Sequence, residues 1–286
     1  NKKICIFIQY MLYEKPEDFG YEIVMGMKKA AEPAGFTVDI IQLTDEIQAK
    51  YTYDEYMLLH NYLGALFLGI TLSDPWLYSF ESCKTPAILQ DNRVSCNDKV
   101  TTIGCDNYKG IKEAVGRLKE LGHTKIGYLS AALGSYVYRE RGDAFFRSLK
   151  EYDLPADEKL AGIAYLTSEC IQEHFQRIYD MGVTAMICSH DLLANALLIH
   201  CMERGIKVPE ELSVIGVDDL PICKYTTPPL SSISQNKSEI GRAAFSALQS
   251  QLSGVPISVL LLHAPLMERE SMGPARERKD VTEKKE

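Results

Sequence analysis

Short apolar runs alternate with segments of helical periodicity from the first residues of the chain to about residue 265. Some runs lack polar alternation, as in "SVIGV" at residues 213–217, which is typical of strands covered on both faces. Between the runs, apolar residues recur at three- and four-residue spacing, as at Ile23, Met27, Ala30 and Ala34. Strands that alternate with helices predict parallel βα units, so we expect an α/β fold.

The alternation divides into two similar series, which predict two similar lobes, each a doubly wound parallel sheet. No single linker rich in glycine, serine or proline separates them, so we expect several crossover connections between the lobes. The final helix and the run "SVLLLHAPL" must then rejoin one of the lobes. The sequence predicts a first lobe of residues 1–105 plus 237–262, a second lobe of residues 106–236 plus 263–271, and a charged tail of residues 272–286.

The composition limits the functions that this segment supports. Its formal net charge of −8 repels phosphate backbones, which argues against direct contact with nucleic acid. Its eight cysteines form no CxxC pair, which favours reduced thiols in a cytoplasmic protein over disulfides or a metal site. The sequence has no apolar stretch of membrane-spanning length and no phosphate-loop, GxSxG or HExxH motif. We therefore expect no membrane contact, no cofactor and no enzymatic activity.

Polar side chains with strong hydrogen-bonding groups follow four of the predicted strands: Asp91, Asp106, the pair His190-Asp191 and Asp218. Ligands of open α/β sheets bind at the carboxyl ends of the strands. Carboxylates accept hydrogen bonds from neighbouring hydroxyl groups, so a sugar or another polyol is a natural partner. As an alternative, Asp191 caps the helix that follows it, and Asp106 and Asp219 cap helices or orient loops.

Two arginines and two aromatic residues extend this set. Arg139 and Arg141 stand just ahead of a predicted amphipathic helix, where the helix dipole disfavours positive charge. A guanidinium donates paired hydrogen bonds, so ligand binding is one explanation and a salt bridge between the lobes is the other. Phe19, after the first strand, and Tyr165, at the end of "LAGIAY", have the chemistry to stack on a sugar ring, unless they belong to the core.

Several long motifs, taken together and in order, resemble one family. They are "LGHTKIGYLS" (121–130), "YRERGDAF" (138–145), "ERGIKVPEELSVIGVDDLP" (203–221), "PPLSSISQNKSEIGRAA" (228–244) and "LMERES" (266–271). Over roughly residues 2–271 the chain resembles the effector-binding core of LacI/GalR transcription regulators. The resemblance implies the fold of type I periplasmic binding proteins, a homodimer, and a small-molecule effector bound between the lobes.

The resemblance also implies roles for particular residues. Asp91 matches the acidic residue after a "PvvxxD"-type strand, Arg141 matches the arginine ahead of a glycine and an aromatic residue, and Asp218 matches the first aspartate of "GxDD"; all three imply effector contacts. His190 stands where the family usually has asparagine or serine, a departure that bears on the identity of the effector. The predicted ligand-binding set is Phe19, Asp91, Arg139, Arg141, Tyr165, His190 and Asp218.

The family implies a function as well as a fold. We expect the ligand-sensing domain of a cytoplasmic repressor that binds a sugar-like effector, or as second choice a nucleobase, and passes lobe closure to DNA-binding heads. These helix-turn-helix heads are missing from the sequence, which starts in the first strand, so DNA contact is expected only through them. Two alternatives are a secreted sugar-binding protein of a transport system, which shares the fold, and an enzyme, for which no nucleophile and base are evident.

Overall fold

The computed structural model describes residues 2–94, 96–131 and 136–276. The chain divides into two compact units, and each is described separately below. Unit 1 contains Asn1–Cys105 and Asn236–Leu262, and unit 2 contains Asp106–Gln235 and His263–Glu286. The chain therefore passes from one unit to the other three times. Each unit is built on a mostly parallel sheet with helices, which confirms the predicted α/β fold with two doubly wound lobes.

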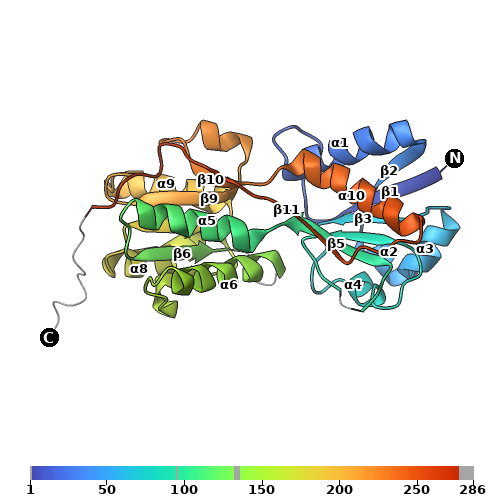
Figure 1. The fold of residues 1–286 in the computed structure, drawn as a ribbon, viewed down its shortest axis with the longest axis horizontal. Helices are drawn as coiled ribbons and strands as arrows, with labels where there is room; N and C mark the ends of the chain where they lie inside the picture. Colours follow the sequence, from blue (N-terminus) through green and yellow to red (C-terminus); the bar gives the residue numbers. More distant parts are fainter. Residues whose placement is uncertain (1, 95, 132–135, 277–286) are drawn as a thin grey trace. The chain divides into compact units, whose positions relative to one another are not determined.

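Unit 1 contains a six-stranded parallel sheet in the order β11-β5-β4-β3-β1-β2 (Figure 1). Its strands are β1 (Lys2–Ile8), β2 (Phe36–Gln42), β3 (Ala65–Leu68), β4 (Ala87–Gln90), β5 (Val100–Cys105) and β11 (Val259–Leu262). Its helices are α1 (Phe19–Ala31), a 3-10 turn (Glu32–Ala34), α2 (Asp45–Lys50), α3 (Tyr53–Leu59), α4 (Pro75–Ser79) and α10 (Lys237–Leu252). An aromatic core of Phe7, Phe67 and Trp76 packs the sheet against α3 and α4.

Helices α1 and α10 lie side by side in unit 1 because each carries a glycine at the contact (Figure 1). A Cβ atom at Gly241 would overlap the carbonyl oxygen of Ile23, and one at Gly26 would overlap the carbonyl oxygen of Ser238. The two helix backbones thus touch directly, since any larger residue would hold them apart. This contact ties a helix from the late part of the chain to the first helix.

Unit 2 contains a six-stranded sheet in the order β12-β10-β9-β8-β6-β7, in which only β12 among the paired strands is antiparallel to its neighbour. Its strands are β6 (Ile126–Ser130), β7 (Ala161–Ile163), β8 (Ala185–Cys188), β9 (Ser213–Asp218), β10 (Ser231–Ser234) and β12 (Leu266–Met267). The expectation that "SVLLLHAPL" forms one strand is wrong, although the lobe bounds given above already divide the run after residue 262. Its first part is β11 of unit 1, and Leu266 starts β12 of unit 2, because Pro265 cannot donate a ladder hydrogen bond.

Helices cover both faces of the unit 2 sheet. They are α5 (Asn107–Glu120), α6 (Tyr136–Glu151), α7 (Thr167–Cys170), a π-helical turn (Ile171–Phe175), α8 (Gln176–Asp180), α9 (Asp191–Arg204) and the short 3-10 turns Glu158–Leu160 and Pro221–Lys224. Tyr128 of β6 stacks on Phe145 of α6 on one face, while the next residue, Leu129, faces the core under α7 to α9. Met272 is buried and Ala275 donates a backbone hydrogen bond to Leu121, so packed chain continues beyond residue 271.

Candidate functional site

The carboxyl ends of four neighbouring parallel strands in unit 2 carry buried polar groups. Since β6, β8, β9 and β10 are parallel neighbours, their ends meet at one edge of the sheet. Ser130 ends β6, Ser189 follows β8, Asp218 ends β9 and Gln235 follows β10, and all four are buried. Buried polar groups are stable only where they form hydrogen bonds with one another or with a ligand.

Arg141 joins this edge from α6 and is 2% exposed. Its Nε donates to Oδ1 of Asn107 at 3.0 Å, one Nη donates to the backbone oxygen of Ser189 at 2.6 Å, and the other lies 3.3 Å from Oδ1 of Asp218. The expectation that Arg139 and Arg141 precede the helix is wrong, because α6 already includes Tyr136 and both arginines lie within it. Arg141 is thus held by partners from α5, β8 and β9, an arrangement that fixes the direction of its guanidinium.

Asp218 lies at the end of β9 in a backbone conformation that non-glycine residues rarely adopt. Its φ angle is 110° and that of Asp219 is 49°. Its Oδ1 accepts hydrogen bonds from Arg141 and, at 2.6 Å, from Nε2 of Gln235. The Asp218 carboxylate therefore faces the guanidinium. This salt bridge lies within unit 2, whereas the alternative that the sequence offered for Arg141 was a bridge between the lobes.

His190 takes the capping role that the sequence analysis offered for Asp191. The backbone N–H of Leu193 donates to Nδ1 of His190 at 3.1 Å, so Nδ1 is unprotonated and the proton of the neutral ring is on Nε2. Burial, together with the positive charge of Arg141, lowers the pKa of His190 to about 4. Near neutral pH, His190 therefore presents an N–H donor.

The other strand-end aspartates have different partners. The carboxylate of Asp191 accepts from the backbone N–H of Leu220 and from the hydroxyl of Ser232, so the prediction that it caps α9 is wrong. Asp219 pairs with Arg269 at 2.7 Å, as expected of a residue that orients a loop. Asp106 caps α5 by accepting from the N–H of Lys109 at 2.9 Å, which is the structural role foreseen for it.

The sequence analysis missed Tyr138, Asn107 and Gln235. The ring of Tyr138 lies 5.4 Å from the guanidinium carbon of Arg141 and 5.6 Å from the ring of His190. Its spacing of three residues from Arg141 on one helix was a signal that could have revealed it. Gln235 follows β10, whose sequence "SSIS" is not the apolar run that marked Asp218. Nothing in the sequence marks the contact of Asn107 with Arg141.

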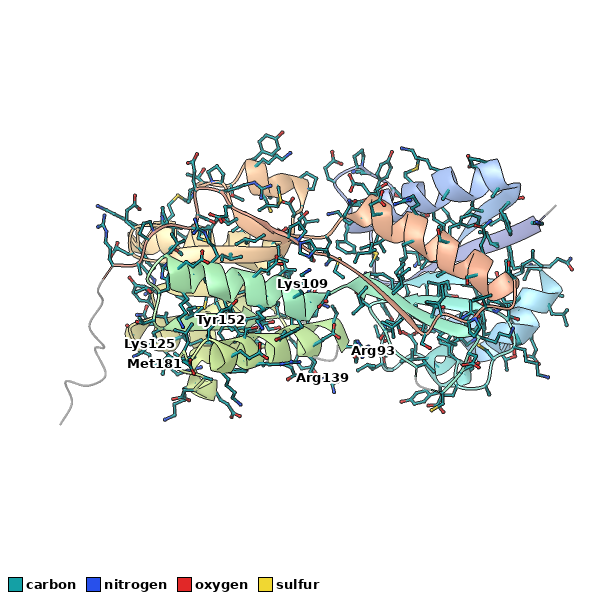
Figure 2. All side chains as sticks on the ribbon, in the orientation of Figure 1. Arg93, Lys109, Lys125, Arg139, Tyr152 and Met181 are labelled. Carbon is teal, nitrogen blue, oxygen red and sulfur yellow. The ribbon has the colours of Figure 1, made fainter. Side chains whose placement is uncertain are left out.

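Arg139 and Tyr165, two members of the predicted set, lie on the surface of unit 2. Arg139 lies in the first turn of α6 and is exposed, and Figure 2 labels it at the lower edge of that helix. Tyr165 is 69% exposed and follows β7, which ends at Ile163 and is shorter than the predicted strand "LAGIAYL". Neither residue contacts the Arg141–Asp218 pair in a hydrogen bond or ring contact within the described part of the chain.

Unit 1 carries the remaining two predicted residues. Asp91 follows β4 with a φ of 57°, its backbone N–H donates to Ile103 at 2.9 Å, and its carboxylate accepts from the side chain of Gln90. A Cβ atom at Gly104 would overlap the Asp91 carboxylate, which therefore lies against β5. Phe19, the first residue of α1, is half-buried, and the ammonium group of Lys237 lies 5.7 Å from its ring centre.

A hollow of about 670 Å³ lies on the opposite side of unit 2. Its lining is Asp157, Glu158, Lys159, Arg177 and Met181. These residues precede β7 and β8, so the hollow is at the amino ends of the strands. It contains none of the strand-end residues described above, and α/β sheets bind ligands at the other end.

Comparisons with known proteins agree with this arrangement. The model of the family described as "Periplasmic binding protein-like domain" matches residues 115–272, more than half of the chain. The HTH-type transcriptional repressor CytR of Escherichia coli (strain K12) is 28% identical over 241 residues, which are 83% of this chain and 70% of that protein. A transcriptional regulator CelR–cellobiose complex has a TM-score of 0.80 at 22% identity, over 95% of this chain and 84% of that one. The dimeric Lac repressor has a TM-score of 0.75 at 20% identity, over 96% of this chain and the whole of that one.

The fold and the polar strand ends define a ligand-binding α/β protein of two lobes. The chain belongs to the periplasmic binding protein-like domain family, and its relatives place it among LacI/GalR transcription regulators as their ligand-sensing, effector-binding domain. The relatives are regulators and not enzymes or secreted components of transporters, so the secreted alternative is set aside. Across the described ranges, none of the helices has the length and apolar character needed to span a membrane.

Proposed function

We propose that unit 2 binds a small polyhydroxylated effector, a sugar or a related polyol, at the carboxyl edge of its sheet. The observation that carries this proposal is the buried Arg141–Asp218 pair, which side chains or backbone from α5, β8 and the residue after β10 hold in place. A guanidinium and a carboxylate fixed side by side offer a donor and an acceptor to vicinal hydroxyl groups without further ordering cost.

His190 and Tyr138 complete the chemistry of the proposed site. The Nε2–H of His190 donates to an effector oxygen, where asparagine or serine would offer a different pattern of donors and acceptors. The ring of Tyr138 offers an apolar face for the C–H groups of a sugar ring. The same face would stack on a planar base, so a nucleobase is the second candidate effector.

The outer contacts of the proposed site come from the other members of the predicted set. Asp91 and Phe19 of unit 1 and Arg139 and Tyr165 of unit 2 are proposed as effector contacts on the strength of the family motifs and their positions next to strand ends. The proposed role of the domain is to sense, without catalysis, inside the cytoplasm. An effector that moves the population from mostly one state to mostly the other needs about 5.5 kcal/mol of differential affinity for the two states.

A thermal-shift panel of cellobiose, D-ribose and hypoxanthine tests the proposal. A compound at one hundred times its Kd stabilises the folded protein by about 2.7 kcal/mol, which raises the melting temperature measurably. We expect Asp218→Asn and His190→Ala to weaken binding of the active compound at least about tenfold in titration calorimetry, because each removes a hydrogen bond to a charged or buried group. Asp106→Asn, which changes a capping residue of the same unit, should leave the Kd unchanged.

The polyol assignment fails if only hypoxanthine raises the melting temperature. The site assignment fails if a compound binds and both the Asp218 and the His190 variants retain its affinity.

We further propose that α9 forms part of a homodimer interface, through which two copies of the chain pair. Leu192, Ile199 and Met202 are 56%, 46% and 64% exposed and lie at seven- and three-residue spacing, which places them on one side of α9. The opposite side, with Leu193, is buried in the core, so this helix is apolar on both sides. A helix that is apolar on both sides normally packs against a second element or a second chain. The dimeric state of the Lac repressor, a structural relative, supports a second copy of this chain as the partner that packs on the exposed apolar side of α9.

Charged substitutions at the exposed apolar positions of α9 are expected to separate the dimer. Ile199→Glu and Met202→Glu should each raise the dimer dissociation constant at least about tenfold, since each places a charge in an apolar contact. Sedimentation equilibrium measures this constant. Leu166→Glu, an exposed apolar position on another element of unit 2, is the control and should leave it unchanged. Dimers as tight as the wild type in both α9 variants would contradict the interface.

A further inference from the structure

The turn that carries Asp218 is under backbone strain. Asp218 and Asp219 are consecutive non-glycine residues with φ angles of 110° and 49°. Such conformations are unfavourable and persist only where the surrounding structure holds them. The direction of the Asp218 carboxylate, and with it the hydrogen bond to Arg141, depends on what holds this turn.

The carboxylate of Asp191 is bonded to the turn both directly and through Ser232. Its Oδ2 accepts from the backbone N–H of Leu220 at 2.7 Å, and its Oδ1 accepts from the hydroxyl of Ser232 at 2.6 Å. The oxygen of Ser232 in turn accepts from the backbone N–H of Asp219 at 3.0 Å. One carboxylate thus fixes the two residues that follow Asp218, directly at Leu220 and through Ser232 at Asp219.

The space around Asp191 shows that the position of its carboxylate is determined. Asp191 is fully buried, and a Cβ atom at Gly216 of β9 would overlap its Oδ1. The carboxylate therefore lies directly on the backbone of the strand that ends at Asp218. Close packing of this kind restricts the side chain to the rotamer that makes these hydrogen bonds.

We propose that Asp191 is a positioning residue that holds the Asp218–Asp219 turn and so aims Asp218 at Arg141. The inference rests on the proposed function, in which Asp218 contacts the effector. Asp191 itself is not proposed to touch the effector, because both its oxygens are bonded within the protein.

The charges around Asp191 bear on its behaviour with pH. Asp218 of β9 and the thiols of Cys188 and Cys223 interact with it. Asp219 and Arg269 act on Cys223, and Arg141 acts on Asp218 and His190. Burial, followed by the charge of Asp218, raises the pKa of Asp191 to about 7, while the hydroxyl of Ser232 lowers it. Above this pKa, the ionised carboxylate accepts both hydrogen bonds with charge assistance, and below it that assistance is lost. The Leu220 amide is therefore expected to report the ionisation of Asp191.

The test is a pH series of amide NMR spectra and hydrogen-exchange rates for the ligand-free protein, the Asp191→Asn variant and the Asp106→Asn control. In the wild type, the Leu220 amide proton should move downfield as pH rises through about 7. In Asp191→Asn this titration should vanish, Leu220 should exchange at least about tenfold faster, and the Arg141 guanidinium signals should shift as Asp218 is released. The Asp106→Asn control should match the wild type.

Ser232→Ala provides a second variant that keeps Asp191 itself, should Asp191→Asn fail to fold. Loss of the hydroxyl that lowers the Asp191 pKa should move the Leu220 midpoint to higher pH. Unchanged Arg141 signals in Asp191→Asn, or an unchanged midpoint in Ser232→Ala, would overturn the proposal. These readouts need no effector, so a panel in which no compound binds would count against the proposed function alone.

Discussion

Replacing Arg141 with alanine is expected to destabilise the protein by about 3–5 kcal/mol, because removal of one partner of a buried ion pair leaves the other charge uncompensated. Asp218 would lose its buried counter-charge, and it lies close to the buried Asp191. The side chain of Asn107 and the backbone oxygen of Ser189 also lose their donor. The same change removes the proposed effector donor, so binding should fall at least about a hundredfold.

Urea unfolding of the empty protein and calorimetry with the active panel compound separate these two effects. Asp218→Asn and the double variant complete a mutant cycle, in which the double variant should lose less stability than the sum of the single ones. Arg139→Ala serves as the stability control, since its exposed side chain should change the free energy of unfolding by less than about 0.5 kcal/mol. Strictly additive losses for Arg141 and Asp218 would show that their pairing contributes nothing.

Replacing Gly241 with alanine is expected to have the largest effect on unit 1. The added methyl group would overlap the backbone oxygen of Ile23, and neither helix backbone is able to yield as a flexible side chain would. Overpacking of this kind costs about 1–3 kcal/mol or more, against which alanine gains about 1 kcal/mol from its helix propensity. We expect a net loss of stability, measured as a lower urea midpoint with the slope unchanged.

Gly142→Ala is the matched control for this substitution. Gly142 also lies in a helix, but a Cβ atom there would meet only the ring of Tyr128, at an ordinary distance of 3.7 Å. Helix propensity alone then applies, and the variant should be as stable as the wild type or more so. A Gly241→Ala variant as stable as the wild type would mean that α1 and α10 move apart with little loss of free energy of unfolding.

The apolar periodicity of the sequence predicted the fold, because this pattern reflects which side chains each strand and helix buries. Gly35 and Gly205 end helical segments in the left-handed conformation that glycine adopts without strain. The pattern failed where packing between distant residues decides the outcome. The short helices α2 and α3 were not predicted, and Pro265 divided an apolar run that looks continuous in sequence.

The candidate site was predictable where it depends on position along a strand. Asp218 and His190 were found because they follow buried runs, and Arg141 because its charge stands near a helix start. Asp191 was misassigned because a sequence does not show that the turn after β9 and the hydroxyl of Ser232 approach the start of α9. The roles of Tyr138 and Gln235 likewise depend on neighbours from other elements.

The discontinuity of unit 1 has a consequence for synthesis on the ribosome. Helix α10 and strand β11, which complete the unit, lie beyond residue 236, after nearly all of unit 2. Until they emerge, the nascent chain exposes the apolar side of α1 and the outer edge of β5. Unit 2 receives β12 only after β11 has been made, so both units wait for elements that are translated after residue 236.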